Sequence, residues 1–502
     1  MSTRTKASLT DSLKEEKDDT VAVENVEDQG QEEEAMEEAR PSTLTTEQEK
    51  KMWRKVDMRI LPILTVMYLC AFMDKGNAKL QGLASQLDLT GHKYNIVLVR
   101  SWTLSVPNPS QWLPAVIVSI STLTGLVKSY PQLMGARIVL GIAEAGLFPG
   151  AMYYMTLWYP RYMLQYRIAI FESGSTLAGA FSGLFAYGIS FMSGTAGLLG
   201  WSWIFILEGI LSLVVGLIAC FILVDIPDTA KFLTKEERTF IVWKKSLSAR
   251  ITTNVKSDKN SLEYDNSLVG EEERFEMRHL VAGVLDWQAR MRLLCVVGEL
   301  LNPLYGISLF LPFGYNTAIS QLLTVPPYVC GVITVIVFAI SSDELKIRSP
   351  FIFAALLMCL AGFSINISDA TIGVKYFGTF LCISGSYAAL PGDFAWIGNN
   401  LAGQGKRAIG MGLLGSLGNF GAVLASNVYL AQDAPYYKFG HKIELIMVGI
   451  GLVSVPLIAL AYRQVNKWRD DKQRELEKRG VQYTVEELRR MGDRAPDFRY
   501  TL

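Results

Sequence analysis

The sequence predicts an all-helical membrane protein made of two helix bundles, and three observations lead to that class. Half of the 502 residues are hydrophobic, only 19% are charged, and the mean hydropathy is +0.24. Soluble chains of this length normally carry about a quarter of charged residues. The apolar residues gather in runs of about 18 to 25, the length at which a helix crosses about 30 Å of hydrocarbon. Glycine is abundant, with 42 residues, as closely packed membrane helices require.

The chain opens with a polar, acidic stretch that includes EDQGQEEEAMEEAR. Such a segment buries too little apolar surface to fold alone, so we expect residues 1–50 to form a disordered tail. It lacks the basic start and apolar core of a signal peptide, so the first spanning helix must act as an uncleaved signal. The stretch TLTTEQEKKMWRKVDMR that follows predicts a short amphipathic helix at the membrane surface.

Eleven apolar runs predict membrane spans, five before a long charged region and six after it. They are Ile60–Met73, Trp112–Val127, Ile138–Trp158, Ile168–Met192, Ile204–Val224, Leu293–Phe313, Leu322–Ile340, Pro350–Ile367, Tyr376–Ile397, Ala408–Leu430 and Ile443–Tyr462. The expected layout is therefore an N-terminal bundle over residues 51–224, a central loop over 225–292 and a C-terminal bundle over 293–463. Residues 464–502 form a polar tail, in which WRDDKQRELEKRG predicts a solvated helix.

The placement of Lys and Arg assigns the two sides of the membrane. These residues cluster in the loop Pro160–Arg167, in the central loop and around Lys346 and Lys406, whereas the intervening connections hold almost none. The positive-inside rule then places the central loop and both tails in the cytoplasm, which requires an even number of spans. The segment between His92 and Gln111 begins as a span but meets an arginine and two prolines, so it predicts a truncated helix 2.

Ionisable residues inside the spans are the strongest functional signal, because each costs about 2.5–3.5 kcal/mol at mid-membrane and normally faces a cavity or a partner. Arg137 and Glu144 are seven residues apart in GARIVLGIAEAGLFPGAMYYMTLWY. Two helical turns place them on one face, roughly 10 Å apart along the axis. An arginine offers a fixed fork to a substrate carboxylate, and a partly dry glutamate can carry a proton. The alternative is that both residues pair with other helices and only hold the bundle together.

Two further positions are candidates. Asp74 and Lys75 stand at the end of the first span, where a charged pair could bind a ligand or equally reach to the interface. Asn419 lies within a stripe of glycines repeated every third residue from Gly412 to Gly421. The stripe favours close helix packing, and the asparagine amide could reach a ligand where the helices meet.

The sequence gives little support for an enzyme, a metal-binding protein or a nucleic-acid-binding protein. The 3 histidines are scattered, and no GxxxxGK[ST] motif for nucleotide binding occurs. The 6 cysteines lie in or beside apolar runs without ligand spacing, so we expect no metal site, disulfide framework or cofactor. A net charge of zero gives no surface for nucleic acid. The sequence therefore does not predict an enzyme.

Several stretches are similar to the major facilitator superfamily, and within it to the anion:cation symporter family, especially its fungal allantoate/nicotinate permease branch. The matching segments include KVDMRILPILTVMYLCAFMDK, GARIVLGIAEAGLFPGAMYYMTLWYPR, GWSWIFILEGILSLVVG, QLLTVPPYV, FAWIGNNLAG and AQDAPYY. The resemblance covers most of residues 50–465. It implies the major facilitator fold, with two six-helix halves and a central site that opens to each side in turn.

The resemblance also implies roles for the candidate residues. Arg137 and Lys75, with Asn419 nearby, would hold an anionic substrate, and Asp74 and Glu144 would exchange protons. The partners would be a small organic anion, a proton and the lipid bilayer, with the chain a monomer in the plasma membrane. The function expected on this basis is proton-coupled symport of a carboxylate or vitamin-like acid.

Three departures from the family pattern keep a second hypothesis open. Lys75 replaces the usual arginine, most of helix 2 is missing, and ISSDELKIRSP replaces the acidic-glycine-basic gate of the second half. Losses of this kind are typical of an inactive paralogue, a mis-spliced product or a membrane sensor that does not transport. Ligand binding without flux would distinguish this alternative from a transporter.

Overall fold

The computed structural model of the chain describes residues 44–73, 124–144, 147–223, 227, 230–250, 317–402, 406–407, 409–415, 438–479, 483, 491–496 and 498–502. Within these ranges the chain forms helices and no strands. The helices are α2 (Thr46–Met73), α6 (Tyr130–Glu144), α7 (Leu147–Trp158), α8 (Leu164–Ser190), α9 (Gly200–Ile222), α10 (Lys235–Arg250), α14 (Thr317–Leu345), α15 (Ser349–Ile367), α16 (Ile372–Asn400) and α18 (Lys438–Lys478). Residues 406–415, apart from position 408, are also helical.

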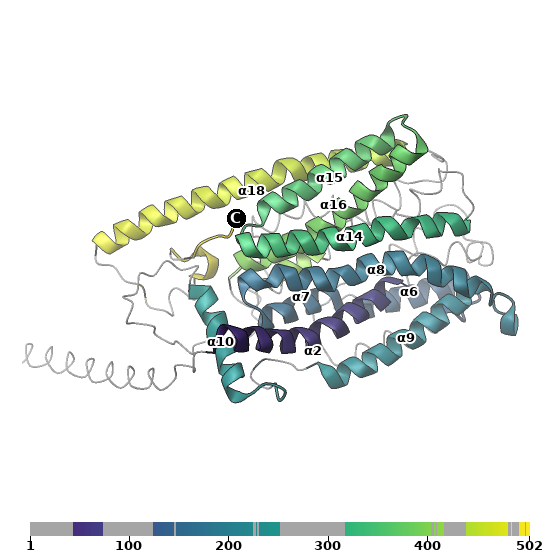
Figure 1. The fold of residues 1–502 in the computed structure, drawn as a ribbon, viewed down its shortest axis with the longest axis horizontal. Coiled ribbons are helices and arrows are strands. Elements are labelled where there is room, and N and C mark those ends of the chain that lie inside the picture. Colours follow the sequence, from purple (N-terminus) through teal and green to yellow (C-terminus); the bar gives the residue numbers. More distant parts are fainter. Residues whose placement is uncertain are drawn as a thin grey trace, which may run out of the picture.

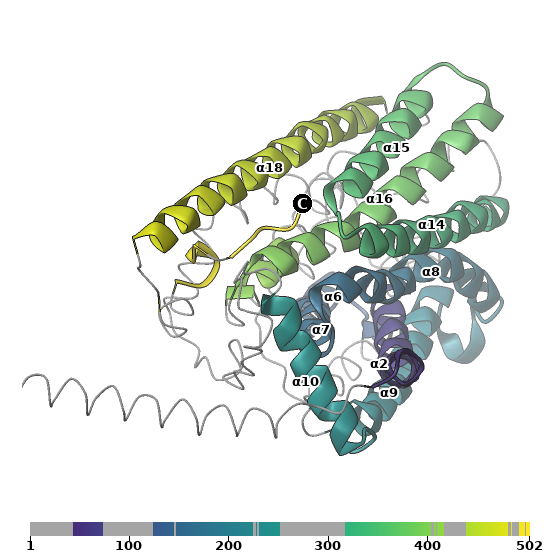
Figure 2. The same ribbon diagram turned by 60° about the vertical axis from the view of Figure 1, so that its left-hand side comes forward.

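The helices form two groups that lie side by side (Figure 1). In the N-terminal half, α2 packs against α8 and α9; in the C-terminal half, α15 packs against α16 and α18. Among the described helices, α8 of the N-terminal half contacts both α14 and α16 of the C-terminal half, and we call this contact region the seam. Figure 2 shows the same division from another side, with α14 and α8 adjacent. This is the two-bundle architecture that the sequence predicts.

Five of the described helices are long and apolar enough to cross a membrane. They are α2, α9, α15, the α14 segment Leu322–Leu345 and the α18 segment Lys438–Leu476. Their outward faces carry exposed apolar side chains such as Phe221, Ile333 and Leu457. Exposed apolar surface of this extent is what a helix in lipid presents, because hydrocarbon surrounds it on one side.

The N-terminal part of α2 differs from its prediction. The sequence favours a short surface helix before the first span, but one continuous helix runs from Thr46 to Met73. A capping box begins it: the Thr45 N–H donates to Gln48 Oε1 at 2.9 Å, and the Gln48 N–H donates to Thr45 Oγ1 at 3.4 Å. Trp53 and Val56 are buried in a core cluster that includes Phe240 of α10, so this amphipathic stretch packs on protein rather than on lipid.

Glycines bring the helices together. A Cβ at Gly174 of α8 would lie 2.6 Å from the carbonyl oxygen of Thr65 on α2. A Cβ at Gly385 of α16 would lie 2.5 Å from the carbonyl oxygen of Ala355 on α15. Because a backbone atom cannot move away as a flexible side chain can, these positions accept only glycine at this helix separation.

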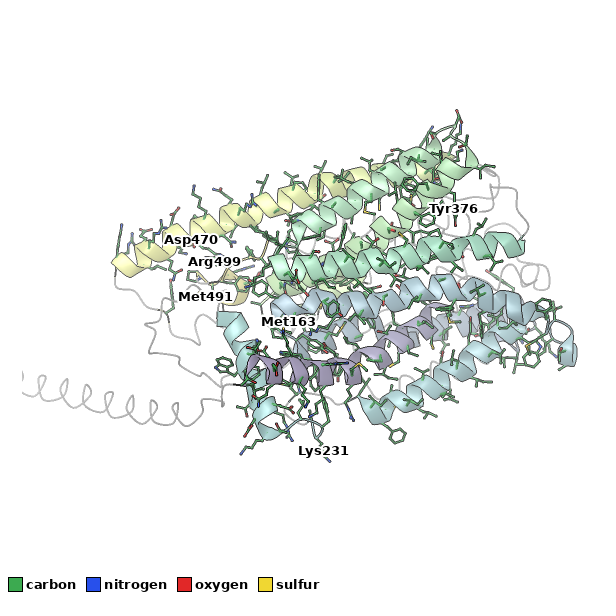
Figure 3. The ribbon with its side chains drawn as sticks, in the orientation of Figure 1. Met163, Lys231, Tyr376, Asp470, Met491 and Arg499 are labelled. Carbon is green, nitrogen blue, oxygen red and sulfur yellow. The ribbon has the colours of Figure 1, made fainter. Side chains whose placement is uncertain are left out.

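The polar tail is more ordered than the sequence suggests. The predicted solvated helix is confirmed, since α18 continues to Lys478. Residues 491–496 and 498–502, here called the C-terminal segment, return to the C-terminal half. In Figure 3, Asp470 of α18 lies close to Met491 and Arg499 of this segment, and Arg499 forms an ion pair with Asp470 at 2.9 Å.

Asn400 at the end of α16 is one of the residues that anchor the C-terminal segment. The Asn400 Oδ1 atom accepts hydrogen bonds from the N–H (2.7 Å) and the hydroxyl (3.0 Å) of Thr501, and its Nδ2 donates to the Thr501 carbonyl at 3.1 Å. Trp396 also donates to that carbonyl, at 2.8 Å. Lys406 forms a buried ion pair with Asp493 at 2.7 Å.

Several predicted features fall outside the described residues. These are the truncated helix 2, the span Leu293–Phe313, most of Trp112–Val127 and the later part of Ala408–Leu430. The run Ile138–Trp158, which the sequence predicts as a single span, is divided between α6 and α7.

Candidate functional site

Arg137 is the one predicted site residue whose side chain is described. It lies in the middle of α6 and is 8% exposed, so its charge is buried within the N-terminal half. Its guanidinium carbon lies 4.6 Å from the ring centroid of Phe205 on α9. A cation over an aromatic face at this distance is attracted by the ring quadrupole, which helps to hold a guanidinium inside a membrane helix.

Glu144 is the last residue of α6, and α7 begins at Leu147. The helix therefore places Glu144 seven residues, or about two turns, beyond Arg137. Asp74, Lys75 and Asn419 lie outside the described residues. The structure thus places Arg137 and Glu144 on one helix and leaves their relation to the other three predicted residues untested.

An aromatic cluster connects the two halves. Tyr68 of α2 stacks on Phe171 of α8 with ring centroids 4.5 Å apart, and Phe148 of α7 lies 5.5 Å from Tyr68. Phe148 also meets Phe394 of α16 edge-on at 4.8 Å. The cluster therefore connects three helices of the N-terminal half with one helix of the C-terminal half.

Glu172 stands next to this cluster and was missed in the sequence analysis. It lies on α8 and is 2% exposed. Its Oε2 atom accepts a hydrogen bond from Ser175 Oγ at 3.1 Å, whereas its buried Oε1 atom has no hydrogen-bond partner among the residues that the structure describes. The signal was present in the sequence, because an acid within the predicted span Ile168–Met192 meets the same criterion that selected Arg137 and Glu144.

Three more acids inside predicted spans, all among the residues that the structure describes, were passed over in the same way. They are buried within the bundle: Glu208 of α9 (4% exposed), Asp393 of α16 (0%) and Glu444 of α18 (1%). Glu172 differs from Glu208 and Glu444 in its place, because it lies on the helix that forms the seam.

A polar cluster joins the two halves at the end of the bundle that the sequence predicts to be cytoplasmic. We call it the inter-half polar cluster; it consists of Gln165, Tyr166, Ser342, Asp343 and Arg348. Asp343 forms an ion pair with Arg348 at 2.5 Å and accepts the Tyr166 N–H at 2.8 Å. Gln165 Oε1 accepts from Ser342 Oγ at 2.7 Å and from Arg348 Nη1 at 2.8 Å.

Three residues of this cluster, Ser342, Asp343 and Arg348, lie in the stretch ISSDELKIRSP, which departs from the expected gate pattern. The acid and the base are nevertheless brought together, and the Asp343 carboxylate meets the first turn of α8, where unsatisfied N–H groups favour a negative charge. The bonds between Gln165 or Tyr166 and the C-terminal half must break whenever the halves separate at this end.

A second ion pair at the same end lies within the N-terminal half. Arg167 of α8 binds Asp57 of α2 through two nitrogens, at 3.2 Å and 3.0 Å. Its guanidinium also covers the ring of Tyr159, with the carbon 4.8 Å from the centroid. Burial raises the pKa of the Tyr159 phenol well above its usual range, and the charge of Asp57 adds to the rise, so this ring stays neutral.

Comparison with known proteins identifies the class of this architecture. Residues 112–426 match the family model described as Major Facilitator Superfamily. The "MFS-type transporter cnsO" of Penicillium expansum is 32% identical over 490 residues, which cover 90% of each chain. The "High-affinity nicotinic acid transporter" of Saccharomyces cerevisiae is 29% identical over 478 residues, covering 90% of this chain and 85% of that one.

A solved structure has the same fold. The partially occluded inward-open xylose transporter XylE of E. coli superimposes with a TM-score of 0.54 at 13% identity, covering 80% of this chain and 96% of that one. The described helices and these matches define a multi-pass helical membrane protein of the transporter class, not an enzyme. The chain belongs to the major facilitator superfamily.

Proposed function

We propose that the chain is a proton-coupled symporter that moves a small organic anion, a carboxylate or a vitamin-like acid, by alternating access. The observation that carries this proposal is the buried Arg137 guanidinium on α6, the helix that ends at Glu144. A permanent cation inside a membrane bundle attracts an anionic substrate, and a nearby acid that binds a proton can compensate the negative charge of that substrate. The similarity to a nicotinic acid transporter supports the choice of an aromatic or aliphatic monocarboxylate.

In this proposal Arg137 and Lys75 hold the carboxylate of the substrate, and Asn419 donates a hydrogen bond to it. Asp74 and Glu144 bind the proton on one side of the membrane and release it on the other. The chain acts as a monomer in the plasma membrane with both tails cytoplasmic. Residues 51–224 and 293–463 form the two halves that rock about the site, and 225–292 connect them.

Uptake into proteoliposomes tests the substrate class. With an acidic exterior, wild-type protein should take up labelled nicotinate above the level in protein-free liposomes, which accounts for passive entry of the neutral acid. Uncharged nicotinamide should not compete. Arg137→Gln removes a charge-assisted contact worth about 1.5–3 kcal/mol, so we expect a rise of about 10- to 100-fold in KM.

Two variants serve as controls. Phe205→Leu removes the ring beneath the guanidinium but keeps the charge, so uptake should persist. Arg137→Lys keeps the charge without the two-pronged geometry and should give an intermediate KM. Uptake of nicotinate by Arg137→Gln with an unchanged KM would contradict the assignment, and saturable nicotinate binding without any flux would favour a non-transporting sensor.

A further inference from the structure

The seam between the halves surrounds a carboxyl group from several sides. Glu172 lies on α8, whose neighbours at the seam are α2 of its own half and α14 and α16 of the other. In the part of the chain that the structure describes, the ionisable side chains that face it are Tyr68 of α2 and Tyr387 of α16, both of which interact electrostatically with it. Tyr328 of α14 lies beside Tyr387, with the two ring centroids 5.9 Å apart.

The packing beside Glu172 is tight. One turn further along α8, the Thr176 Cγ2 atom lies 3.3 Å from where a Cβ would stand at Gly331 of α14. Two turns along, a Cβ at Gly179 would lie 2.6 Å from the Tyr328 ring. The helices α8 and α14 are therefore in direct contact one and two turns beyond Glu172.

The hydrogen bonds available to the carboxyl group are too few for a negative charge. The Ser175 hydroxyl carries a single hydrogen, and its oxygen lies 2.8 Å from the Glu172 carbonyl and 3.1 Å from Oε2. Among the described residues no Lys, Arg or His forms an ion pair with Glu172. An ionised carboxylate with one shared donor is strongly disfavoured at a position that is 2% exposed, whereas the neutral acid is tolerated.

We propose that Glu172 is a proton-binding site of the seam, and that the two halves close around it only when it is protonated. Separation of α14 and α16 from α8 admits water, and the acid then releases its proton as the carboxylate forms. Glu172 thus adds a third acid to Asp74 and Glu144, and it acts on the contact between the halves rather than on the substrate. The inference deepens the proposed proton coupling and rests on it for its role in transport.

Seam closure can be measured without any substrate. In Thr176→Cys/Gly331→Cys protein, oxidative cross-linking reports contact between α8 and α14. Because closure takes up one proton, we expect the ratio of closed to open protein to fall by up to about tenfold per pH unit as pH rises. Adding Glu172→Gln, which is permanently neutral, should keep cross-linking high and independent of pH.

The matched control is Glu444→Gln, an equally buried acid on α18 away from the seam, which should leave the pH response of the double-cysteine protein unchanged. A second readout uses no cysteines: the Tm of wild-type protein should fall between pH 5 and pH 8, and the Tm of Glu172→Gln should change less. If Glu172→Gln keeps the wild-type pH dependence in both measurements, the proposal is overturned. If the pH response depends on Glu172 but no acid is transported, the seam site stands and the proposed substrate class fails.

Discussion

The inter-half polar cluster gives a prediction whose size follows from the structure. Asp343→Asn keeps an oxygen that can accept the Tyr166 N–H but removes the charge that faces Arg348. Arg348 is 0% exposed, so the substitution removes a carboxylate charge that faces a fully buried guanidinium. Removing one member of a buried pair costs about 3–5 kcal/mol.

The low end of that range applies here, because Arg348 keeps its hydrogen bonds to Gln165 at 2.8 Å and to Ser342 at 3.1 Å. A loss of about 3 kcal/mol corresponds to a fall in Tm of roughly 6–12 °C for a unit of 150–250 residues. Scanning fluorimetry of the purified protein measures this shift.

The control is the same substitution in an exposed pair. Asp369 is 94% exposed where it meets Lys438 at 3.3 Å, so Asp369→Asn should leave Tm almost unchanged. In a double-mutant cycle, Arg348→Gln added to Asp343→Asn should cost much less than Arg348→Gln alone, since the ion pair between the two side chains is then already lost. Equal Tm values for wild type and Asp343→Asn, or strictly additive costs in the cycle, would refute the reasoning.

Two further predictions concern packing and the C-terminal segment. Gly385→Ala places a methyl group 2.5 Å from the Ala355 carbonyl oxygen, so Tm should fall by several degrees. The control is Gly449→Ala on α18, which has nothing within 4 Å of its Cβ and should have little effect on Tm. Equal Tm changes in the two variants would show that the α15–α16 contact is not close. Asn400→Ala removes three hydrogen bonds to Thr501, so the rate of amide hydrogen exchange in residues 498–502 should rise by at least tenfold. Asn466→Ala removes only contacts to Tyr500 and should raise the exchange rate less. Unchanged protection in Asn400→Ala would show that Asn400 does not anchor the C-terminal segment.

The sequence predicts the helices well where hydropathy alone decides them. The run Pro350–Ile367 corresponds to α15, Ser349–Ile367, and Ile204–Val224 to α9, Gly200–Ile222, because a long run of mostly apolar residues leaves few alternatives to a spanning helix. The start of α2 was predicted less well. Its amphipathic face could pack on lipid or on protein, and only the position of α10 settles that choice.

The candidate site was less predictable. Arg137 was found because a charge in an apolar run is visible in the sequence, but its contact with Phe205 of α9 depends on how two distant helices pack. Glu172 met the same criterion and was overlooked. Its distinction is its place at the seam, which follows from the contacts of α8 with α14 and α16 and not from the residues around it in the chain.

The position of the C-terminal segment could not be predicted from the sequence either. Its sequence is polar enough to read as solvated, yet Phe498 and Tyr500 are buried, and Arg469 donates hydrogen bonds to the carbonyl oxygens of Phe498 and Asp493. Partners 24 and 29 residues apart in the chain carry no periodic signal. Tertiary contacts therefore fix this part of the structure.

The most direct test of proton-coupled anion transport compares nicotinate uptake into proteoliposomes at one external pH, 5.5, with the interior at pH 7.5 or at pH 5.5. Each pH unit stores about 1.4 kcal/mol per proton, so one-to-one symport can raise accumulation by up to about 100-fold across two units. We predict a large, protein-dependent excess with the gradient, which a protonophore abolishes. Protein-dependent uptake that is equal with and without the gradient would contradict the account.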